Sequence, residues 1–197
     1  DMIPYTPTLA SSSLLGRTTT STFVLEQPRC VFSTMENDTN IIIWLVVATP
    51  EGRWVNFNNS LGPGTKARAF QMFPSDTSAY MTLGTTILQY PCLKNPGDIT
   101  VLRVGSETSC AKNNSRPTCN GPLPFPGPYR VKFLAFNGSE PVAETDWSAP
   151  ITLKEAKAYN SIPTMGSRHS GGMIAITTIL SILFAVLLAG LLAMIIS

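Results

Sequence analysis

The chain has 197 residues, of which 13% are charged, and its 14 basic and 12 acidic residues nearly balance. This length allows one domain, or at most two small ones, in addition to a C-terminal anchor. A nucleic-acid surface needs clustered Lys and Arg, so the charge balance argues against such a partner. The single histidine, His169, leaves little room for a zinc site or a histidine-based catalytic triad.

The sequence also lacks the short motifs of common enzyme classes. It contains no G-x-S-x-G, no H-E-x-x-H and no phosphate-binding glycine loop. Glu140 and Glu144 lie in an expected hairpin, and we interpret them as part of a solvated face. We therefore expect no catalytic residue, metal site, cofactor or enzymatic activity; a membrane-bound hydrolase is the alternative.

The first 155 residues predict an all-β domain, an antiparallel sandwich of short strands. In chain order, strands are expected at residues 22–26, 41–47, 66–73, 80–83, 99–104, 129–136 and 151–154. Residues 22–26 alternate between apolar and polar types, as in a half-buried strand. Residues 41–47 are all apolar and rich in β-branched types, which predicts a central strand buried on both faces. The 16 prolines and 14 glycines favour many short strands joined by turns.

Residues 123–153 carry the sharpest local pattern. Alternation places Tyr129, Val131 and Phe133 on one face, with Arg130 and Lys132 facing outward. A tyrosine just after a Pro-Gly turn resembles the tyrosine corner of β-sandwiches, whose hydroxyl holds the preceding loop. The string Y-x-V-x-F-x-A-x-N and the following W-S-x-P resemble the last two strands of a fibronectin type III domain. Gly127 is one residue closer to the tyrosine than in that family, and an unrelated hairpin with a tyrosine is the alternative.

Four cysteines and four N-glycosylation sequons lie in the polar part of the chain. The sequons begin at Asn37, Asn58, Asn113 and Asn137. Four cysteines allow three pairings, and free or intermolecular thiols are a further alternative. We favour Cys110–Cys119, which closes a short loop around Asn113, and Cys30–Cys92, which joins two β regions. Sequons and cysteines together predict a luminal or extracellular domain that passes through the endoplasmic reticulum.

Residues 171–197 form an uncharged run that predicts one transmembrane helix. At about 1.5 Å per residue, residues 173–196 would make a helix of roughly 36 Å, enough to cross a hydrocarbon core of about 30 Å. A buried helix of a soluble domain is the alternative, but such helices are rarely so long and uncharged. The flanking charges leave the orientation ambiguous or reversed, yet the sequons and cysteines favour a type I topology with the N-terminus outside.

Small side chains recur every four residues in this segment, at Thr177, Ser181, Ala185, Ala189 and Ala193. Such stripes let a second helix approach closely within lipid, so the ridge predicts a helix–helix interface. The alternative is the ordinary abundance of Ala and Ser in membrane spans. The expected organisation is a β domain at 1–155, a juxtamembrane stalk at 156–170 and the transmembrane helix at 171–197. A cytoplasmic tail is expected to follow Ser197. A cleaved secretory signal, or a shortened sequence, would explain the start at Asp1.

Taken together, the motifs resemble the uroplakin III family, and most closely its b or b-like branch. The matching strings, in chain order, are LEQPRCVF from Leu25, WLVVA from Trp44, VLRVG from Val101, CNGPLP from Cys119, PYRVKFL from Pro128, WSAPITL from Trp147 and SGGMIAITTI from Ser170. The resemblance covers nearly the whole chain, from about Thr6 to the end of the uncharged run.

The resemblance implies a structural function. Members of that family are type I glycoproteins that pair with a tetraspanin uroplakin of the Ib type. The pairs join other uroplakin pairs in plaques of the apical urothelial membrane, a permeability barrier. The competing hypothesis is a receptor or adhesion subunit that binds a ligand through its β domain. On that hypothesis Trp54 and Phe57 could mark a binding loop, although packing on the sheet is the simpler interpretation of both residues.

Overall fold

The computed structural model describes residues 1–50, 57–93, 95–155 and 166–196. Contacts within the chain divide it into two units, Asp1–Glu155 and Ala156–Ser197. The described part of the first unit is built almost entirely from strands, turns and short 3-10 helices, and the described part of the second is an α-helix. The chain is therefore a mostly β domain followed by one helix.

The larger of two sheets has five strands in the order β1-β7-β6-β3-β4. Its members are β1 (Met2–Ile3), β3 (Ile41–Ala48), β4 (Ala79–Thr86), β6 (Arg130–Asn137) and β7 (Glu140–Thr145). The apolar strand β3 is interior, as expected, and pairs antiparallel with both β4 and β6. The short β1 pairs parallel with β7, which the sequence-based expectation of an antiparallel sandwich did not include.

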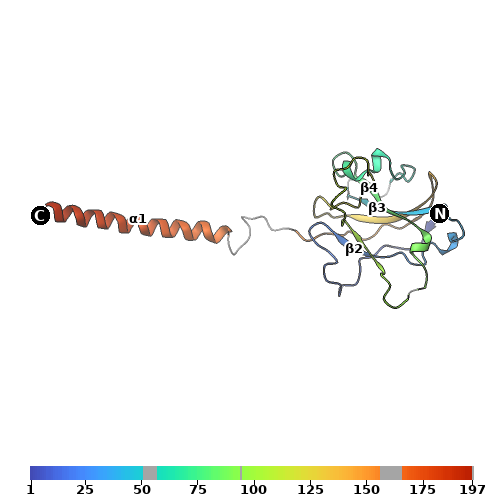
Figure 1. Ribbon diagram of the computed structural model, residues 1–197, viewed down its shortest axis with the longest axis horizontal. Helices are drawn as coiled ribbons and strands as arrows, with labels where there is room; N and C mark the ends of the chain where they lie inside the picture. Colours follow the sequence, from blue (N-terminus) through green and yellow to red (C-terminus); the bar gives the residue numbers. More distant parts are fainter. Residues whose placement is uncertain (51–56, 94, 156–165, 197) are drawn as a thin grey trace. The chain divides into compact units, whose positions relative to one another are not determined.

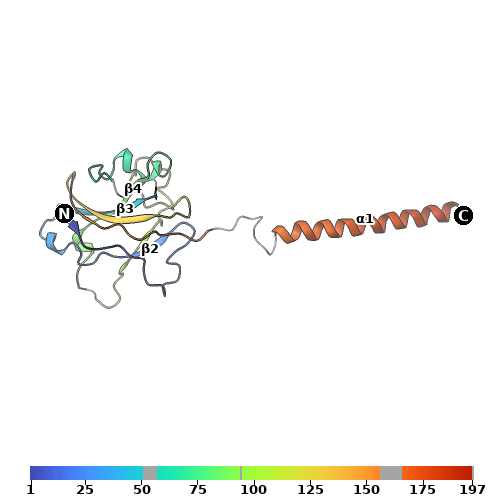
Figure 2. The same cartoon turned by 180° about the vertical axis from the view of Figure 1, so that it is seen from behind.

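The smaller sheet consists of β2 (Phe23–Glu26) and β5 (Val101–Val104), paired antiparallel. Both ribbon views place β2 in a separate layer from β3 and β4 (Figures 1 and 2). The main core lies between the two sheets, and it contains Phe23 and Leu25 of β2, Val104 of β5, Ile43 and Leu45 of β3, and Val131 and Phe133 of β6. Because alternate side chains of a strand point to opposite faces, the alternating residues of β6 supply this core as predicted.

The outer face of the larger sheet is also apolar. Val46, Met81, Leu134 and Phe136 form a second buried cluster there, against which Trp44, Phe57 and Trp147 pack. Trp44 lies over Gly84, where a Cβ atom would come within 2.5 Å of the indole ring. The pairing of β3 with β4 is irregular between Ile43 and Leu45. The glycine therefore makes room for the tryptophan at this irregularity.

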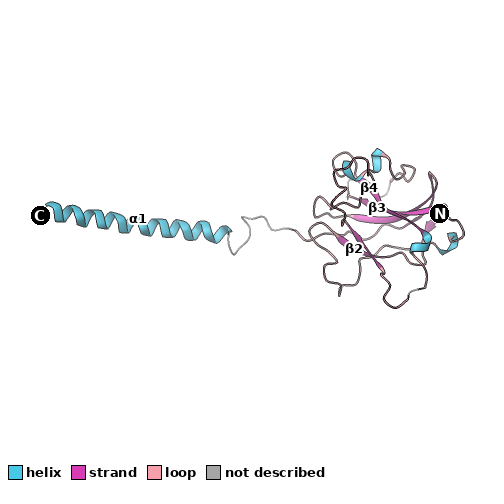
Figure 3. Ribbon diagram, viewed as in Figure 1, coloured by secondary structure: helices cyan, strands magenta, loops and turns pink. Residues whose placement is uncertain are grey.

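The predicted strand at residues 66–73 is wrong. The structure has two 3-10 helices there, η4 (Lys66–Arg68) and η5 (Phe70–Met72), and Figure 3 shows short helical turns beside β4. Phe70 and Phe73 pack their rings 5.1 and 4.8 Å from that of Tyr80. The Phe70 amide donates to Pro117 rather than to a neighbouring strand. The apolar residues thus anchor a loop, and a short apolar segment does not by its sequence alone distinguish such a loop from a strand.

Residues 151–154 do not form a strand either, because only Ile151 pairs, in an isolated bridge with Tyr129. The amide of Leu153 donates instead to the carbonyl of Pro126, and that of Lys154 to Thr19. The segment therefore follows loops rather than a sheet edge. The likeness of the C-terminal part to a fibronectin type III domain stays a prediction.

The second unit contains α1 (Gly166–Ile196), a helix of 31 residues. It begins before Gly171, so the segment Gly166–Ser170 of the expected stalk is helical; residues 156–165 lie outside the described residues. The side chains from Leu180 to Ile196 are exposed. Among the residues that the structure describes, none belongs to a helix with the length and hydropathy required to cross a bilayer.

Candidate functional site: the glycosylation loops and their supports

The four sequons lie on the surface of the β domain. Asn37 follows the 3-10 helix η1 (Ser33–Met35), Asn58 and Asn113 lie in loops, and Asn137 ends β6. Each asparagine is exposed, and so is the Ser or Thr two positions later in every case. Because glycosylation needs an accessible surface loop, the arrangement is compatible with modification of all four, and occupancy stays a prediction.

Two of the sequons adopt a local turn closed by the asparagine side chain. The Oδ1 atom of Asn58 accepts a hydrogen bond of 2.9 Å from the amide of Ser60. The Oδ1 atom of Asn113 accepts from both the amide and the hydroxyl of Ser115, at 3.0 and 2.6 Å. These are Asx turns, and they hold the asparagine and the hydroxyl residue of each sequon together.

The other two sequons are linked to one another through Asp38. The side-chain amide of Asn137 donates to an Asp38 carboxylate oxygen at 3.0 Å. Asp38 is the residue after Asn37, so the first and the fourth sequons meet at one place on the surface. This neighbourhood joins the loop before β3 to the β6–β7 turn.

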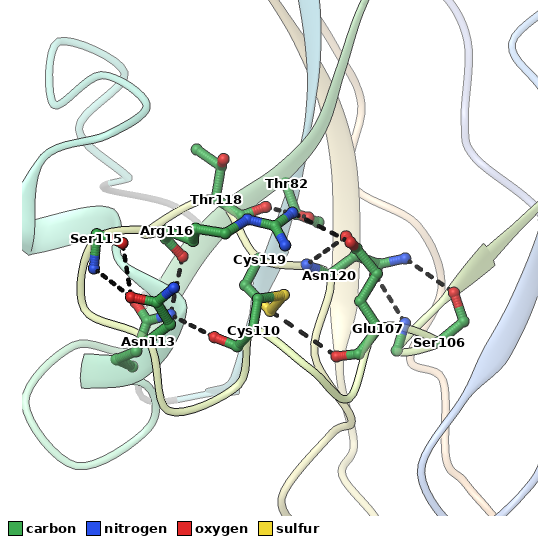
Figure 4. Close-up of a disulfide and its surroundings, with 12 residues drawn as sticks. Thr82, Ser106, Glu107, Cys110, Asn113, Ser115, Arg116, Thr118, Cys119 and Asn120 are labelled. Atoms are coloured by element: carbon green, nitrogen blue, oxygen red, sulfur yellow. Dashed lines mark hydrogen bonds and ion pairs between the residues drawn. A yellow bond between two sulfur atoms is a disulfide. The ribbon is translucent and has the colours of Figure 1, made fainter.

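The loop that carries Asn113 is closed by the disulfide Cys110–Cys119, with Cα atoms 5.8 Å apart (Figure 4). Inside it, backbone hydrogen bonds run from Asn113 to Cys110, from Arg116 to Asn113 and from Cys119 to Arg116. The ion pair between Arg116 and Glu107 spans 3.1 Å but is about half exposed. Such pairs contribute roughly 0–1 kcal/mol, so the disulfide and the turns fix the loop.

Asn120, next to this disulfide, is a buried polar residue that the sequence-based interpretation missed. Its Oδ1 accepts from the amide of Gly105 at 2.7 Å, and its Nδ2 donates to the carbonyl of Arg103 at 3.0 Å. These bonds connect the disulfide loop to β5 and the turn after it. Figure 4 shows a further bond of Asn120, from its Nδ2 to the hydroxyl of Ser106 at 3.4 Å. Because unpaired buried backbone groups are costly, Asn120 is a main support of this loop.

The second disulfide, Cys30–Cys92, closes a sequence separation of 62 residues. It joins the segment after β2 to the segment after η6 (Ile87–Gln89). The amide of Cys30 also donates to Tyr90, and the guanidinium of Arg29 donates to the carbonyl of Leu93. Both disulfides are the pairs favoured from the sequence, and all four cysteines are therefore oxidised.

Beside the Asn58 sequon, Lys132 is buried on the outer face of the larger sheet. Its Nζ donates to Oδ1 of Asn59 at 2.8 Å and to Oε2 of Glu144 at 3.0 Å. Its side chain is only 5% exposed, and that of Glu144 is 23% exposed. Asn59 also donates to the same carboxylate oxygen. The interpretation of Glu144 as part of a solvated face is therefore wrong, while Glu140 is exposed as expected.

Aromatic rings complete the surroundings of this lysine. Nζ of Lys132 lies 4.6 Å from the ring centre of Phe57 and 4.8 Å from that of Trp147. The two rings meet edge to face at 5.4 Å, and the guanidinium of Arg68 lies 4.2 Å from Phe57. Phe57 thus packs on the sheet rather than projecting as a binding residue. Trp54 lies outside the described residues.

The pKa values of Lys132 and Glu144 follow from the burial of this ion pair. Desolvation lowers the pKa of Lys132 below its ordinary value, although the hydrogen bond and charge of Glu144 act in the opposite direction. Burial acts to raise the pKa of Glu144, but the hydrogen bond from Asn59 and the bond and charge of Lys132 outweigh it, so that pKa lies below its ordinary value. Glu144 is therefore ionised and paired at neutral pH.

The remaining predicted site residues lie in α1. Ser181, Ala185, Ala189 and Ala193 are exposed in the unit that contains them. Thr177 belongs to the same helix, but its side chain lies outside the described residues. Within the described parts of both units, no cluster of three or more His, Cys, Asp or Glu side chains could hold a metal ion. The ridge stays a prediction.

Known proteins resemble the chain along most of its length. Human uroplakin-3b-like protein 1 is 42% identical over 189 residues, which cover 92% of this chain and 65% of that protein. Bovine uroplakin-3b-like protein 1 is 39% identical, with 92% of this chain and 69% of that protein covered. Human uroplakin-3a is 30% identical, with 93% and 71% covered. No protein-family model matches the chain.

The chain spans about two thirds of the length of these relatives. The matches extend over both units, and they include uroplakin-3b-like proteins at 37–42% identity and uroplakin-3a at about 30%. The chain therefore belongs to the uroplakin-3 family, a family of non-enzymatic structural membrane proteins.

Proposed function

We propose that this chain is a single-pass type I membrane glycoprotein that pairs with a tetraspanin uroplakin of the Ib type and builds apical membrane plaques. The observation that carries the proposal is the family match over 92% of the chain, through the β domain and into the helix. The four exposed sequons and two disulfides support an extracellular or luminal domain.

Membrane anchoring by α1 is part of this proposal. Residues 171–197 contain no ionisable side chain. The side chains described from Leu180 to Ile196 are exposed and almost all apolar. In water such a surface would be unfavourable by about 25 cal/mol per Å², whereas a hydrocarbon core accommodates it at no cost. The organisation into a β domain, a stalk and a span belongs to the same proposal, as does an apical plasma-membrane location.

The structural function is favoured over a receptor because of how the β domain uses its aromatic residues. Phe57 and Trp147 pack on each other and around Lys132. No described residue of the suggested binding loop is left as an exposed aromatic anchor of the kind that dominates ligand-binding hot spots. The helix ridge at Ser181, Ala185, Ala189 and Ala193 is the surface we assign to the tetraspanin partner.

Purification from native membranes in mild detergent, followed by mass spectrometry of the co-purifying chains, tests the proposal. A stoichiometric tetraspanin uroplakin is expected. Ala185→Leu with Ala189→Leu should reduce its recovery, because larger side chains separate closely packed helices. Gly190→Leu is the control, since it adds comparable bulk about 100° around the helix from Ala189 and about 140° from Ala185, the two substituted positions.

Two results would contradict the pairing with a tetraspanin, and a third would contradict only the assignment of the ridge. Recovery of the chain alone, or efficient secretion of its β domain as a stable monomer with a soluble ligand, would favour the receptor hypothesis. Equal recovery of the tetraspanin with the ridge variant and with Gly190→Leu would remove the ridge from the interface while leaving the pairing itself intact.

A further inference from the structure

One loop of the β domain holds two leucines in water. In the segment between Ala10 and Arg17, the side chain of Leu15 is 93% exposed and that of Leu14 is 38% exposed. An ordered loop that exposes leucines forgoes their burial, which normally stabilises a fold. Leu88 and Leu93 are similarly exposed elsewhere in the domain, at 73% and 85%, and exposed leucines are common on protein surfaces. The case for an occupant of this loop therefore rests on the groups around Leu14 and Leu15.

The loop is held firmly in the conformation that projects the leucines. The amide of Ala10 donates to Val24 at 2.9 Å, and the amide of Val24 donates to Arg17 at 2.7 Å, so both ends are fixed to β2. The guanidinium of Arg17 donates to Ala10 at 3.2 Å, and that of Arg103 donates to Gly16 at 3.1 Å. Gly16 has a φ of +74°, a left-handed conformation that glycine adopts without strain.

The same end of the domain is where the chain leaves it. The amide of Lys154 donates to the carbonyl of Thr19, two residues beyond Arg17, at 3.0 Å. Glu155 is the last residue of the unit. Lys154 and Arg103 are exposed and Arg17 is half-buried. We call Leu14, Leu15, Arg17, Arg103 and Lys154 the exit rim.

The exit rim combines apolar tips with three cations. This is the chemistry of a surface that rests on lipid, with leucines entering the acyl boundary and basic side chains beside headgroup phosphates. Glu155 is a carboxylate next to the rim, and the cations still outnumber it. Ten residues separate Glu155 from Gly166 in the sequence, so at about 3.5 Å per residue the tether spans at most roughly 35 Å.

We propose that the exit rim docks on the outer leaflet of the bilayer in which α1 is anchored. The inference rests on the proposed function, because it needs α1 to be the anchor. A short tether keeps the rim at a high effective concentration near the lipid, so even weak insertion of two leucines suffices. The consequence is a β domain held close to the membrane at one defined edge.

Site-directed spin labelling of the full-length chain in phosphatidylcholine nanodiscs tests this docking. A nitroxide at Leu15→Cys is compared with one at Ile99→Cys, whose side chain is 76% exposed in the segment before β5. We expect the label at position 15 to be relaxed preferentially by oxygen, and the label at position 99 by a water-soluble nickel chelate. One label per chain, verified by mass, shows that the native disulfides are intact.

A further variant separates docking from local folding. Lys154→Gln removes a rim charge but keeps the backbone bond to Thr19. It should increase the accessibility of the Leu15→Cys label to the chelate several-fold. A label at position 15 as accessible as that at 99, in chains that co-float with the nanodiscs, would overturn the docking alone. Equal protection of both labels would overturn it too. Chains that fail to enter nanodiscs would instead overturn the anchoring in the proposed function.

Discussion

Replacing Glu144 with glutamine should destabilise the β domain. The size of the effect depends on how deeply the ion pair between Lys132 and Glu144 is buried. Breaking a fully buried ion pair by removing one partner costs about 3–5 kcal/mol, and an exposed pair contributes only about 0–1 kcal/mol. The Lys132 side chain is 5% exposed and the Glu144 side chain 23% exposed. After Glu144→Gln, the ammonium keeps Oδ1 of Asn59 and the faces of Phe57 and Trp147. Cation–π contacts contribute about 1–2 kcal/mol when desolvated.

We therefore expect a loss of about 2 kcal/mol in the free energy of unfolding at neutral pH, between those limits. Urea titration followed by tryptophan fluorescence measures it, because Trp147 lies beside the pair. Glu140→Gln is the matched control in the same strand β7, where the side chain is exposed, and it should change stability by less than about 0.5 kcal/mol. Adding Lys132→Met to Glu144→Gln should recover part of the loss, since the unpaired charge is removed.

The pH dependence of stability provides an independent check that the ionised Glu144 carboxylate stabilises the fold. The folded pKa of Glu144 lies below its ordinary value of 4.5. Its contribution is therefore fully present above that value and is lost as the pH falls through the folded pKa. The difference between native chain and Glu144→Gln should stay constant down to about pH 5 and shrink below it. Equal losses for Glu144→Gln and Glu140→Gln, or a difference that grows in acid, would refute the buried-pair reasoning.

Four further outcomes are expected. Tyr129→Phe should cost about 1–2 kcal/mol, measured by urea titration, because its hydroxyl donates to Phe125 at 2.5 Å. Asn120→Ala should cost about 1–3 kcal/mol by leaving the Gly105 amide unpaired, whereas Asn114→Ala, at an exposed residue, should be neutral. Burial raises the pKa of Tyr129 to about 12 and also raises those of Tyr5, Tyr80 and Tyr90. Because the folded state retains these protons while the unfolded state loses them, the free energy of unfolding should fall as the pH rises above about 10. A free energy of unfolding that stays unchanged at alkaline pH would contradict this. Each Asn→Gln change at positions 37, 58, 113 and 137 should remove one glycan from the mass of the secretory-pathway protein, and an unshifted mass would mark an unoccupied sequon.

The local patterns of the sequence were sufficient for the strands whose side chains alternate against a core. Residues 41–47 and 129–136 lie almost entirely within β3 and β6, and the Tyr129 hydroxyl binds the preceding loop at Phe125 as expected of a tyrosine corner. The disulfide pairing favoured among the three possible ones is also the one formed, since Cys110 and Cys119 close a short loop and leave Cys30 to pair with Cys92. In each case, residues near in sequence or fixed by covalent chemistry determined the structure.

The same patterns failed where the partner was distant in sequence. Residues 66–73 were expected to form a strand, yet Phe70 and Phe73 pack on Tyr80 and the segment forms two 3-10 helices. Glu144 is polar in a hairpin, but Asn59, far away in the chain, donates to it and helps to bury Lys132. The local sequence cannot distinguish these residues from residues of a strand or of a solvated face, because their burial depends on which distant loop packs on the sheet.

The sequence by itself therefore determined the family, the two-unit organisation that we propose, the sequons and the main strands. Each of these depends on composition, on residue spacing or on a contiguous pattern of residues. Only the tertiary structure placed the first and fourth sequons together at Asp38, buried the Lys132 pair and used Asn120 to support a disulfide loop. It also exposed Leu14 and Leu15 and joined the segment that follows them to the end of the domain through the bond between Thr19 and Lys154. These features depend on contacts between segments far apart in the sequence, and the packing of the whole domain decides which of those segments come together.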